Sequence, residues 1–284
     1  MPSSTSSSNS HARAPELPPL PAWGVALVAL VALLGGWEMF WRARGHTPSV
    51  GDDMALWSAQ RAALLEREAP VALLGASRMQ LGFDMETWRE FAPHLEPFML
   101  AVPGSSPVEV IQHLGEDEDF SGTIIASISE EMLEPRTWVT QANHVKYYRN
   151  QYRVGAVIEG WLDTQVERHL AMLDTAVNPR LVFSLFLKEQ RLPEPNYINL
   201  KPDRGRTADY LGQPAEWLVE HREWREGDER KKLEMHPVST PEEWKGRLDV
   251  LDEAIQRIEA RGGHVVFVRF PISGTFEEDM EEFY

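Results

Sequence analysis

Residues 71–78 read Val-Ala-Leu-Leu-Gly-Ala-Ser-Arg, and this stretch decides the fold that the sequence predicts. The apolar run has the length of a buried strand in a parallel sheet, and it ends at Gly75-Ala76-Ser77. Open α/β sheets bind ligands at the carboxyl ends of their strands, and the glycine allows a sharp turn that would present the Ser77 hydroxyl. The position suits a nucleophile. The plainer alternative is that these residues only shape the turn and cap a helix.

A second apolar run ends in a similar loop. Residues 98–102 are Phe-Met-Leu-Ala-Val, and they lead into Pro103-Gly104-Ser105-Ser106-Pro107. If the two strands are parallel neighbours, their loops meet at one edge of the sheet. We therefore expect the backbone amide of Gly104 to lie where it can stabilise the oxyanion formed when Ser77 attacks a carbonyl.

Two further strands complete the predicted sheet, one at 123–128 and one at 264–270. A helix precedes the last strand, because Thr240-Pro241-Glu242-Glu243 has the pattern of a capping box with proline at the first helical position. Gly262 ends this helix. The order of strands and helices predicts an α/β fold with a parallel sheet and right-handed crossovers.

These loops resemble motifs of the SGNH/GDSL-type hydrolase superfamily, especially of its membrane-anchored bacterial members linked to acylation or deacylation of cell-envelope polysaccharides. The likeness covers roughly residues 69–128 and 240–274. It implies a flavodoxin-like, three-layer α/β domain with a helical insertion. It also implies that Ser77 is the catalytic nucleophile and that the amides of Ser77 and Gly104 bind the oxyanion.

Two residues next to these motifs are candidates for substrate binding. One oxyanion donor of the family is missing from this chain. Arg78 follows Ser77 and is a candidate to bind an anionic group of the substrate. The alternative is that Arg78 pairs with a carboxylate of the protein itself. Ser105 follows the oxyanion glycine. The family's asparagine donor is absent after residues 123–128. The hydroxyl of Ser127 or Ser129 is the candidate that replaces the asparagine as oxyanion donor. The alternative is that this segment only ends the strand and has no catalytic role.

The family's catalytic base is also missing. Its Asp-x-x-His block does not occur after the last predicted strand, and the sequence ends at Tyr284. We therefore expect a truncated or frame-shifted product, and the competing interpretation is a complete chain that keeps the fold for binding or assembly. His264 begins a strand, which points it away from the carboxyl edge. The other histidines that we considered occur singly, without the spacing of metal ligands: His94, His113, His144, His169, His221 and His236.

The composition excludes several classes of function. The formal net charge of −16 opposes general affinity for nucleic acid and for anionic lipid headgroups. The chain has no cysteine, which excludes disulfides, thiolate metal sites and cysteine nucleophiles. We therefore expect no nucleic-acid partner, no metal and no cofactor.

The amino-terminal part predicts a membrane anchor. Residues 1–21 are rich in serine and proline, which is typical of a disordered tail. Residues 22–41 form an apolar run of about 20 residues, the length that spans a bilayer, with tryptophans at both ends. A cleavable signal peptide is the rival, but no Ala-x-Ala site follows the run. Arg42 and Arg44 do not favour an external globular part, whereas the family resemblance implies one that faces the periplasm.

The remaining chain divides into a juxtamembrane segment and one domain. Residues 42–68 include an amphipathic helix at 54–68, and residues 69–284 form the α/β domain with a helical insertion at about 136–239. The predicted apolar face of the juxtamembrane helix consists of Leu56, Ala59, Ala63 and Leu64, with Trp57 on its flank.

The insertion and two acidic runs give less specific information about function. Residues 160–173 and 181–189 are predicted helices, and prolines break the stretch that follows into loops. The insertion could cap the Ser77 edge and select a substrate, or it could dock a partner. The acidic runs at 116–119 and 277–282 are predicted to be solvated and exposed.

The family resemblance, together with the predicted anchor, implies an esterase or O-acyltransferase of the bacterial inner membrane. It would act on carbohydrate esters of the envelope, with activity impaired by the missing base. The alternative is a non-catalytic component that binds or assembles a polysaccharide export or acylation system. The expected partners are the lipid bilayer, a carbohydrate ester and the envelope polysaccharide machinery.

Overall fold

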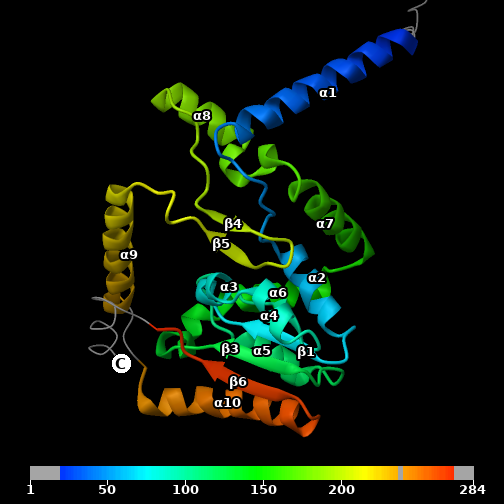
Figure 1. Ribbon diagram of the computed structural model, residues 1–284. Helices are drawn as coiled ribbons and strands as arrows, with labels where there is room; N and C mark the ends of the chain where they lie inside the picture. The colour runs from blue at the N-terminus through cyan, green and yellow to red at the C-terminus, as the bar shows by residue number, and fades with distance from the viewer. Residues whose placement is uncertain (1–19, 236–238, 272–284) are drawn as a thin grey trace, which may run out of the picture.

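The computed structural model describes residues 20–235 and 239–271 (Figure 1). The predicted tail at 1–21 falls almost wholly outside the described residues, and the acidic run at 277–282 falls outside them entirely.

The central element is a parallel sheet of four strands in the order β2-β1-β3-β6. The strands are β1 (Pro70–Leu74), β2 (Glu96–Met99), β3 (Thr123–Ser127) and β6 (His264–Val268). All three pairings are parallel, with Ala72 opposite Phe98 on one side and Ile124 on the other. The predicted α/β class, the parallel sheet and its four strands are therefore confirmed.

Helices cover both faces of this sheet. One face carries α2 (Met54–Leu64), α5 (Val108–Glu116), α6 (Val139–Asn150) and α10 (Pro241–Ala260). The other face carries α3 (Ser77–Gly82) and α4 (Met85–Phe91). Two apolar cores result, because alternate residues of a strand point to opposite faces of the sheet. Figure 1 shows α10 below β6, and α10 also packs against α5.

The capping box before α10 is confirmed. The hydroxyl of Thr240 accepts from the amide of Glu243, and the carboxylate of Glu243 accepts from the amide of Thr240 at 2.8 Å. In this helix Leu251 and Ile258 are buried, whereas Leu248 is exposed. Trp244, in the first half of the helix, packs partly buried against the same core.

The juxtamembrane helix α2 is confirmed, but it ends at Leu64 and its buried face differs from the prediction. Trp57 is fully buried and donates from its indole to the carbonyl of Leu100 at 2.9 Å. Arg61 is also fully buried. The prediction placed Trp57 only on the flank and left out Arg61, because an arginine is not expected in a core until its partner is known.

The insertion between β3 and α10 is mostly helical, as predicted, but it also contains a small hairpin. Its helices and short 3-10 turns are η1 (Glu130–Leu133), η2 (Pro135–Thr137), α6, α7 (Val154–Glu167), η3 (Ala171–Leu173), η4 (Thr175–Val177), α8 (Pro179–Glu189) and α9 (Ala215–Met235). The hairpin pairs β4 (Ile198–Leu200) with β5 (Arg206–Ala208). The prediction that prolines break the stretch after residue 189 into loops was wrong at this hairpin, whereas α9 begins after the last of these prolines, Pro214.

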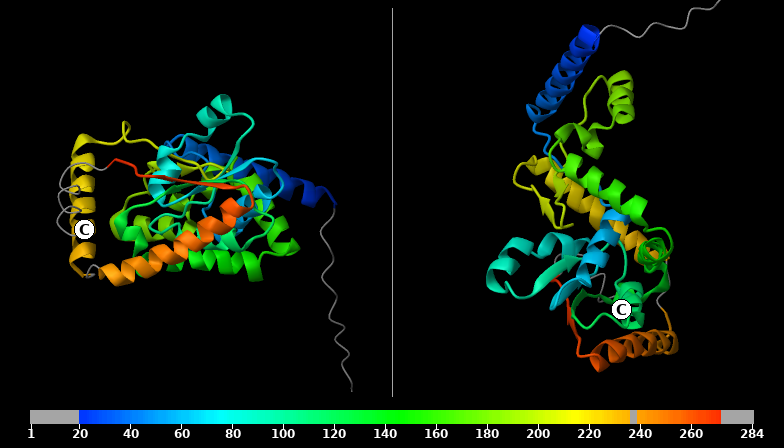
Figure 2. Two further views of the ribbon diagram at one scale, coloured as in Figure 1. Left: turned by 90° about the horizontal axis from the view of Figure 1, so that it is seen from below. Right: turned by 90° about the vertical axis from the view of Figure 1, so that its right-hand side faces the viewer.

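The amino-terminal helix α1 (Leu20–Arg42) extends away from the rest of the protein (Figure 2). Residues 21–42 of this helix are long and apolar enough to cross a membrane, and the most apolar window has no buried residue. This agrees with the apolar run predicted at 22–41.

Candidate functional site

The chain changes direction across the sheet at β1. From β1 it passes through α3 and α4 on one face to β2, and it then returns through α5 on the other face to β3. Loops on the two sides of such a point diverge at the carboxyl edge, and open α/β sheets bind their ligands there. Ser77 opens the helix that follows β1, so the structure places it at this point.

Gly75 fixes the turn before Ser77. Its φ of +138° lies in a region that other residues rarely adopt. A Cβ at this position would lie 2.9 Å from the Cβ of Ser127 at the end of β3. The carbonyl of Gly75 accepts from the amide of Val102 at 2.9 Å and from the side-chain amide of Gln141 at 3.2 Å. A glycine is therefore required where the ends of β1, β3 and the β2 loop meet.

Ser77 and Gly104 lie at this edge with free polar groups. Ser77 is half-buried, and its hydroxyl has no hydrogen-bond partner among the described residues. Gly104 is exposed with a φ of +64°, two residues beyond the Val102 amide that bonds to Gly75. The two residues that the sequence predicted as nucleophile and oxyanion donor thus follow neighbouring parallel strands, Ser77 after β1 and Gly104 after β2.

The two substrate-binding candidates have different environments. Arg78 is exposed at the start of α3. Ser105 is buried, and its hydroxyl donates to the carbonyl of Thr137 at 3.0 Å and accepts from the amide of Gln141 at 3.2 Å. The hydroxyl of Ser105 therefore ties the loop after β2 to η2 and α6 instead of facing a substrate.

The two serines at the end of β3 do not replace the family's asparagine by any contact that we observe. Ser127 is buried against Gly75, and Ser129 is half-buried before η1. The carboxylate of Glu130, the next residue, accepts from Arg269 after β6 at 2.7 Å. The plain strand end is therefore the simpler interpretation of this segment.

Histidines of the described chain form contacts elsewhere, and none bonds to Ser77. His144 bonds to the carbonyl of Thr140 at 2.8 Å and packs edge-on against Trp57. His221 stacks on Trp217. His264 pairs with Thr123 at the amino-terminal end of the sheet, which confirms that it points away from the Ser77 edge. His236 lies outside the described residues.

His113 belongs to a second polar cluster that includes part of the acidic run at 116–119. Its two ring nitrogens face Arg61 and Arg149 at 3.2 and 2.9 Å. Burial, and then the charges of these two arginines, lower the pKa of His113 to about 3. Asp117 pairs with Arg61, and this pairing holds the pKa of Asp117 below its usual range although burial opposes the shift. The prediction of a merely solvated acidic loop was therefore wrong at Asp117.

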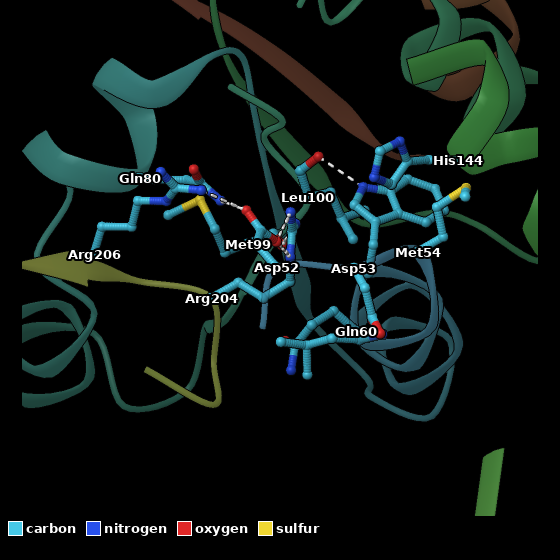
Figure 3. Close-up of polar contacts among 12 residues, drawn as sticks. Asp52, Asp53, Met54, Gln60, Gln80, Met99, Leu100, His144, Arg204 and Arg206 are labelled. Carbon is cyan, nitrogen blue, oxygen red and sulfur yellow. Dashed lines mark hydrogen bonds and ion pairs between the residues drawn. The ribbon is translucent and has the colours of Figure 1, made fainter. Parts of the chain in front are cut away.

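A third polar group was not predicted at all, and it lies at the carboxyl edge (Figure 3). Asp52, between α1 and α2, accepts from the guanidinium groups of Arg204 and Arg206, each at 2.8 Å. The side chain of Gln80 in α3 donates to the same carboxylate at 3.2 Å. Arg204 is fully buried and also donates to the carbonyl of Met99 at 2.7 Å. We call Asp52, Gln80, Arg204 and Arg206 the Asp52 cluster.

The Asp52 cluster joins three parts of the protein beside Ser77. Asp52 belongs to the juxtamembrane segment and the arginines to the hairpin, while Gln80 lies three residues after Ser77 in the same helix. The two arginines keep the pKa of Asp52 below its usual range, although its burial acts in the opposite direction. Neither charge nor spacing in the sequence points to a pair that is 152 residues apart.

A cavity of about 490 Å³ lies between the hairpin and the segment that joins α3 to α4. Its walls combine apolar and aromatic side chains with charged ones, and they include Leu81, Phe83, Glu86, Lys201, Arg206 and Tyr210. Leu81 lies one turn after Ser77, and Arg206 belongs to the Asp52 cluster. The cavity therefore adjoins α3 and the Asp52 cluster, and none of the four predicted site residues is among the described residues that line it.

Within residues 20–235 and 239–271, no three side chains of the metal-binding kinds come together as a metal site would require. Comparisons with protein-family models, with curated proteins and with solved structures gave no significant match.

Proposed function

We propose that this protein is a membrane-anchored, SGNH-like serine esterase or O-acyltransferase that acts on carbohydrate esters of the bacterial envelope. The observation that carries the proposal is the position of Ser77. It follows a strand at the point where the chain changes direction across the sheet, after a glycine with a positive φ, and its hydroxyl has no partner in the described chain.

In the proposed reaction the hydroxyl oxygen of Ser77 attacks the ester carbonyl. The bond to the ester's alcohol breaks, and the alcohol leaves with the proton of the Ser77 hydroxyl. The amides of Ser77 and Gly104 stabilise the oxyanion. Water or a sugar hydroxyl then takes the acyl group from Ser77, which gives hydrolysis or transfer. An unactivated serine is a weak nucleophile, so we expect slow formation of the acyl-enzyme.

The membrane part of the proposal rests on α1. This helix is long and apolar enough to cross a bilayer once, and the family resemblance implies a globular part on the periplasmic side of the inner membrane. Protease added to intact spheroplasts should then digest the α/β domain. Protection of the domain until the membrane is permeabilised would instead place it in the cytoplasm, as Arg42 and Arg44 favour.

Labelling with a serine-directed fluorophosphonate tests the nucleophile. We expect slow labelling of the full chain and its loss in Ser77→Ala. The matched control is Ser129→Ala, which removes a half-buried serine from the same edge of the sheet and should leave the labelling rate unchanged. Labelling that persists in Ser77→Ala would disprove this role of Ser77.

The second candidate function is a non-catalytic envelope component that uses the same edge to hold a glycan or a protein of an export or acylation complex. It is favoured by the absence of any hydrogen bond between Ser77 and a histidine of the described chain. This candidate predicts that Ser77→Ala fully complements a deletion strain. A null phenotype for that variant would favour the enzyme.

A further inference from the structure

Two helices of the insertion expose apolar faces. In α7, Ile158, Trp161 and Leu162 are at least 49% exposed, and in α8, Phe183, Phe186 and Leu187 are at least 58% exposed. Each set has the i, i+3, i+4 spacing of one helical face. We call these six residues the interfacial surface. Neither helix has a buried residue, so the apolar side chains are not part of either core.

The packing of α7 fixes the direction of its apolar face. The opposite side of the helix lies on α2, where a Cβ on Gly160 would be 3.2 Å from Ala55. The carboxylate of Glu167, on that same side, accepts from the amide of Gly51 at 2.8 Å. Ile158 and Trp161 are therefore held outward.

The segment between α7 and α8 is bonded to the last turns of α1. Glu38 accepts from the amides of Ala171 and Met172, each at 2.9 Å, and Arg42 donates to the carbonyl of His169 at 2.8 Å. The residues after α7 and the turn η3 therefore lie against the end of α1 from which the globular part departs. In Figure 1 and in the right view of Figure 2, α7 runs across the direction of α1 rather than along it. A helix in that position lies along the surface of the bilayer that α1 crosses.

We propose that the interfacial surface is a second membrane contact, which rests in the boundary between headgroups and acyl chains beside α1. Amphipathic helices bury their apolar side about 5–10 Å into this boundary, and tryptophan favours it. Arg168, after α7, and Lys188, at the end of α8, are exposed and can reach lipid phosphates. The contact would set the height and tilt of the Ser77 edge above the membrane. It rests on the proposed membrane span of α1.

Site-directed spin labelling tests this contact, since the chain has no cysteine of its own. Single variants Ile158→Cys and Phe186→Cys of the full chain are labelled and placed in nanodiscs of phosphatidylethanolamine and phosphatidylglycerol. Collision with oxygen and with a water-soluble nickel chelate is then measured. Asp163→Cys, on the polar side of α7, is the matched control, and Leu30→Cys in α1 reports the span.

We expect the ratio of oxygen to nickel accessibility at positions 158 and 186 to exceed that at position 163 severalfold. A ratio equal to that at position 163 would overturn the second contact, while a lipid-facing label at position 30 would leave the anchor intact. Exclusion of both reagents at 158 and 186 would mean that protein covers the surface, either a partner or a second copy, and would also overturn it. A water-exposed label at position 30 would refute the span itself.

Discussion

The two ends of the sheet each hold a fully buried arginine, and the two arginines are used differently. Arg204 lies at the carboxyl end, beside Ser77, and pairs with Asp52 across 152 residues of sequence. Arg61 lies at the amino end and pairs with Asp117 across 56 residues. Both clusters adjoin α2, since Asp52 precedes that helix and Arg61 lies in its last turn.

The difference shows where the protein depends on polar contacts. Arg61 joins α2 to the end of α5, and these helices also share the large apolar core on one face of the sheet. Arg204 joins the hairpin, the juxtamembrane segment and the end of β2 at the carboxyl edge. Both ends are therefore tied by a buried arginine, and the arginine at the carboxyl edge joins segments that lie much farther apart in the sequence.

The largest effect is expected from Arg204→Met. It leaves the carboxylate of Asp52 in a mostly buried position without its main partner, which costs about 3–5 kcal/mol of the free energy of unfolding. Denaturant titration of the detergent-solubilised protein measures the loss. Arg206→Met is the control with a smaller cost, because Arg206 is more exposed and makes one contact with Asp52. Equal costs for the two variants would contradict the central position of Arg204.

Gly75→Ala tests the carboxyl edge directly. The positive φ and the 2.9 Å approach to Ser127 predict a loss of about 1–3 kcal/mol, together with loss of fluorophosphonate labelling because Ser77 is displaced. Gly104→Ala is the matched control for backbone strain. Gly104 also has a positive φ, but no atom lies within 4 Å of the position that its Cβ would take. It should cost about 1 kcal/mol or less. A fully labelled Gly75→Ala would show that the turn does not position Ser77.

Arg61→Met should have a smaller effect on stability than Arg204→Met, about 2 kcal/mol, because Asp117 is partly exposed and can turn toward water. Labelling of Ser77 should stay as in the parent chain, since Arg61 lies at the other end of the sheet. Comparison of the unfolding curves and the labelling rates of the two arginine variants sharpens the contrast. A loss of labelling in Arg61→Met would show that the two ends are coupled.

The last prediction concerns the pH dependence of stability and His113. The pKa of His113 is about 3 in the folded chain, against 6.5 for a free imidazole. Between these values the unfolded chain binds a proton that the folded chain does not, so stability falls as pH decreases. His113→Gln should remove up to about 1.4 kcal/mol per pH unit of this dependence. The slope of the free energy of unfolding against pH is measured between pH 6.5 and 4.5. This window lies above the pKa range of the paired carboxylates. An unchanged slope would contradict the neutral state of His113.

Local signals made much of the fold predictable. Short apolar runs predicted the four strands, the capping box at Thr240 predicted the start of α10, and the apolar run after residue 21 predicted α1. The hairpin escaped prediction because its strands have three residues each, too few for an alternating pattern. Helix α9 escaped because it is charged around most of its circumference and has no apolar stripe.

The candidate site was predictable in part. Gly75, Ser77 and Gly104 were found because turns and strand ends depend on residues that are adjacent in the sequence. The structural use of Ser105 was missed, because its partners Thr137 and Gln141 lie more than 30 residues away. The exposed apolar face of α7 was not predicted, because the sequence alone does not say whether the core covers such a face.

The sequence by itself therefore determined the parallel sheet, the serine turn and an apolar segment long enough for a membrane. Those features follow from residues close together in the chain. Only the tertiary structure decided that Asp52 meets Arg204, that Arg61 is buried and that the apolar side of α7 faces outward. The physical reason is that burial and ion pairing depend on which distant segments the folded chain brings together, and this information is not contained in any local stretch.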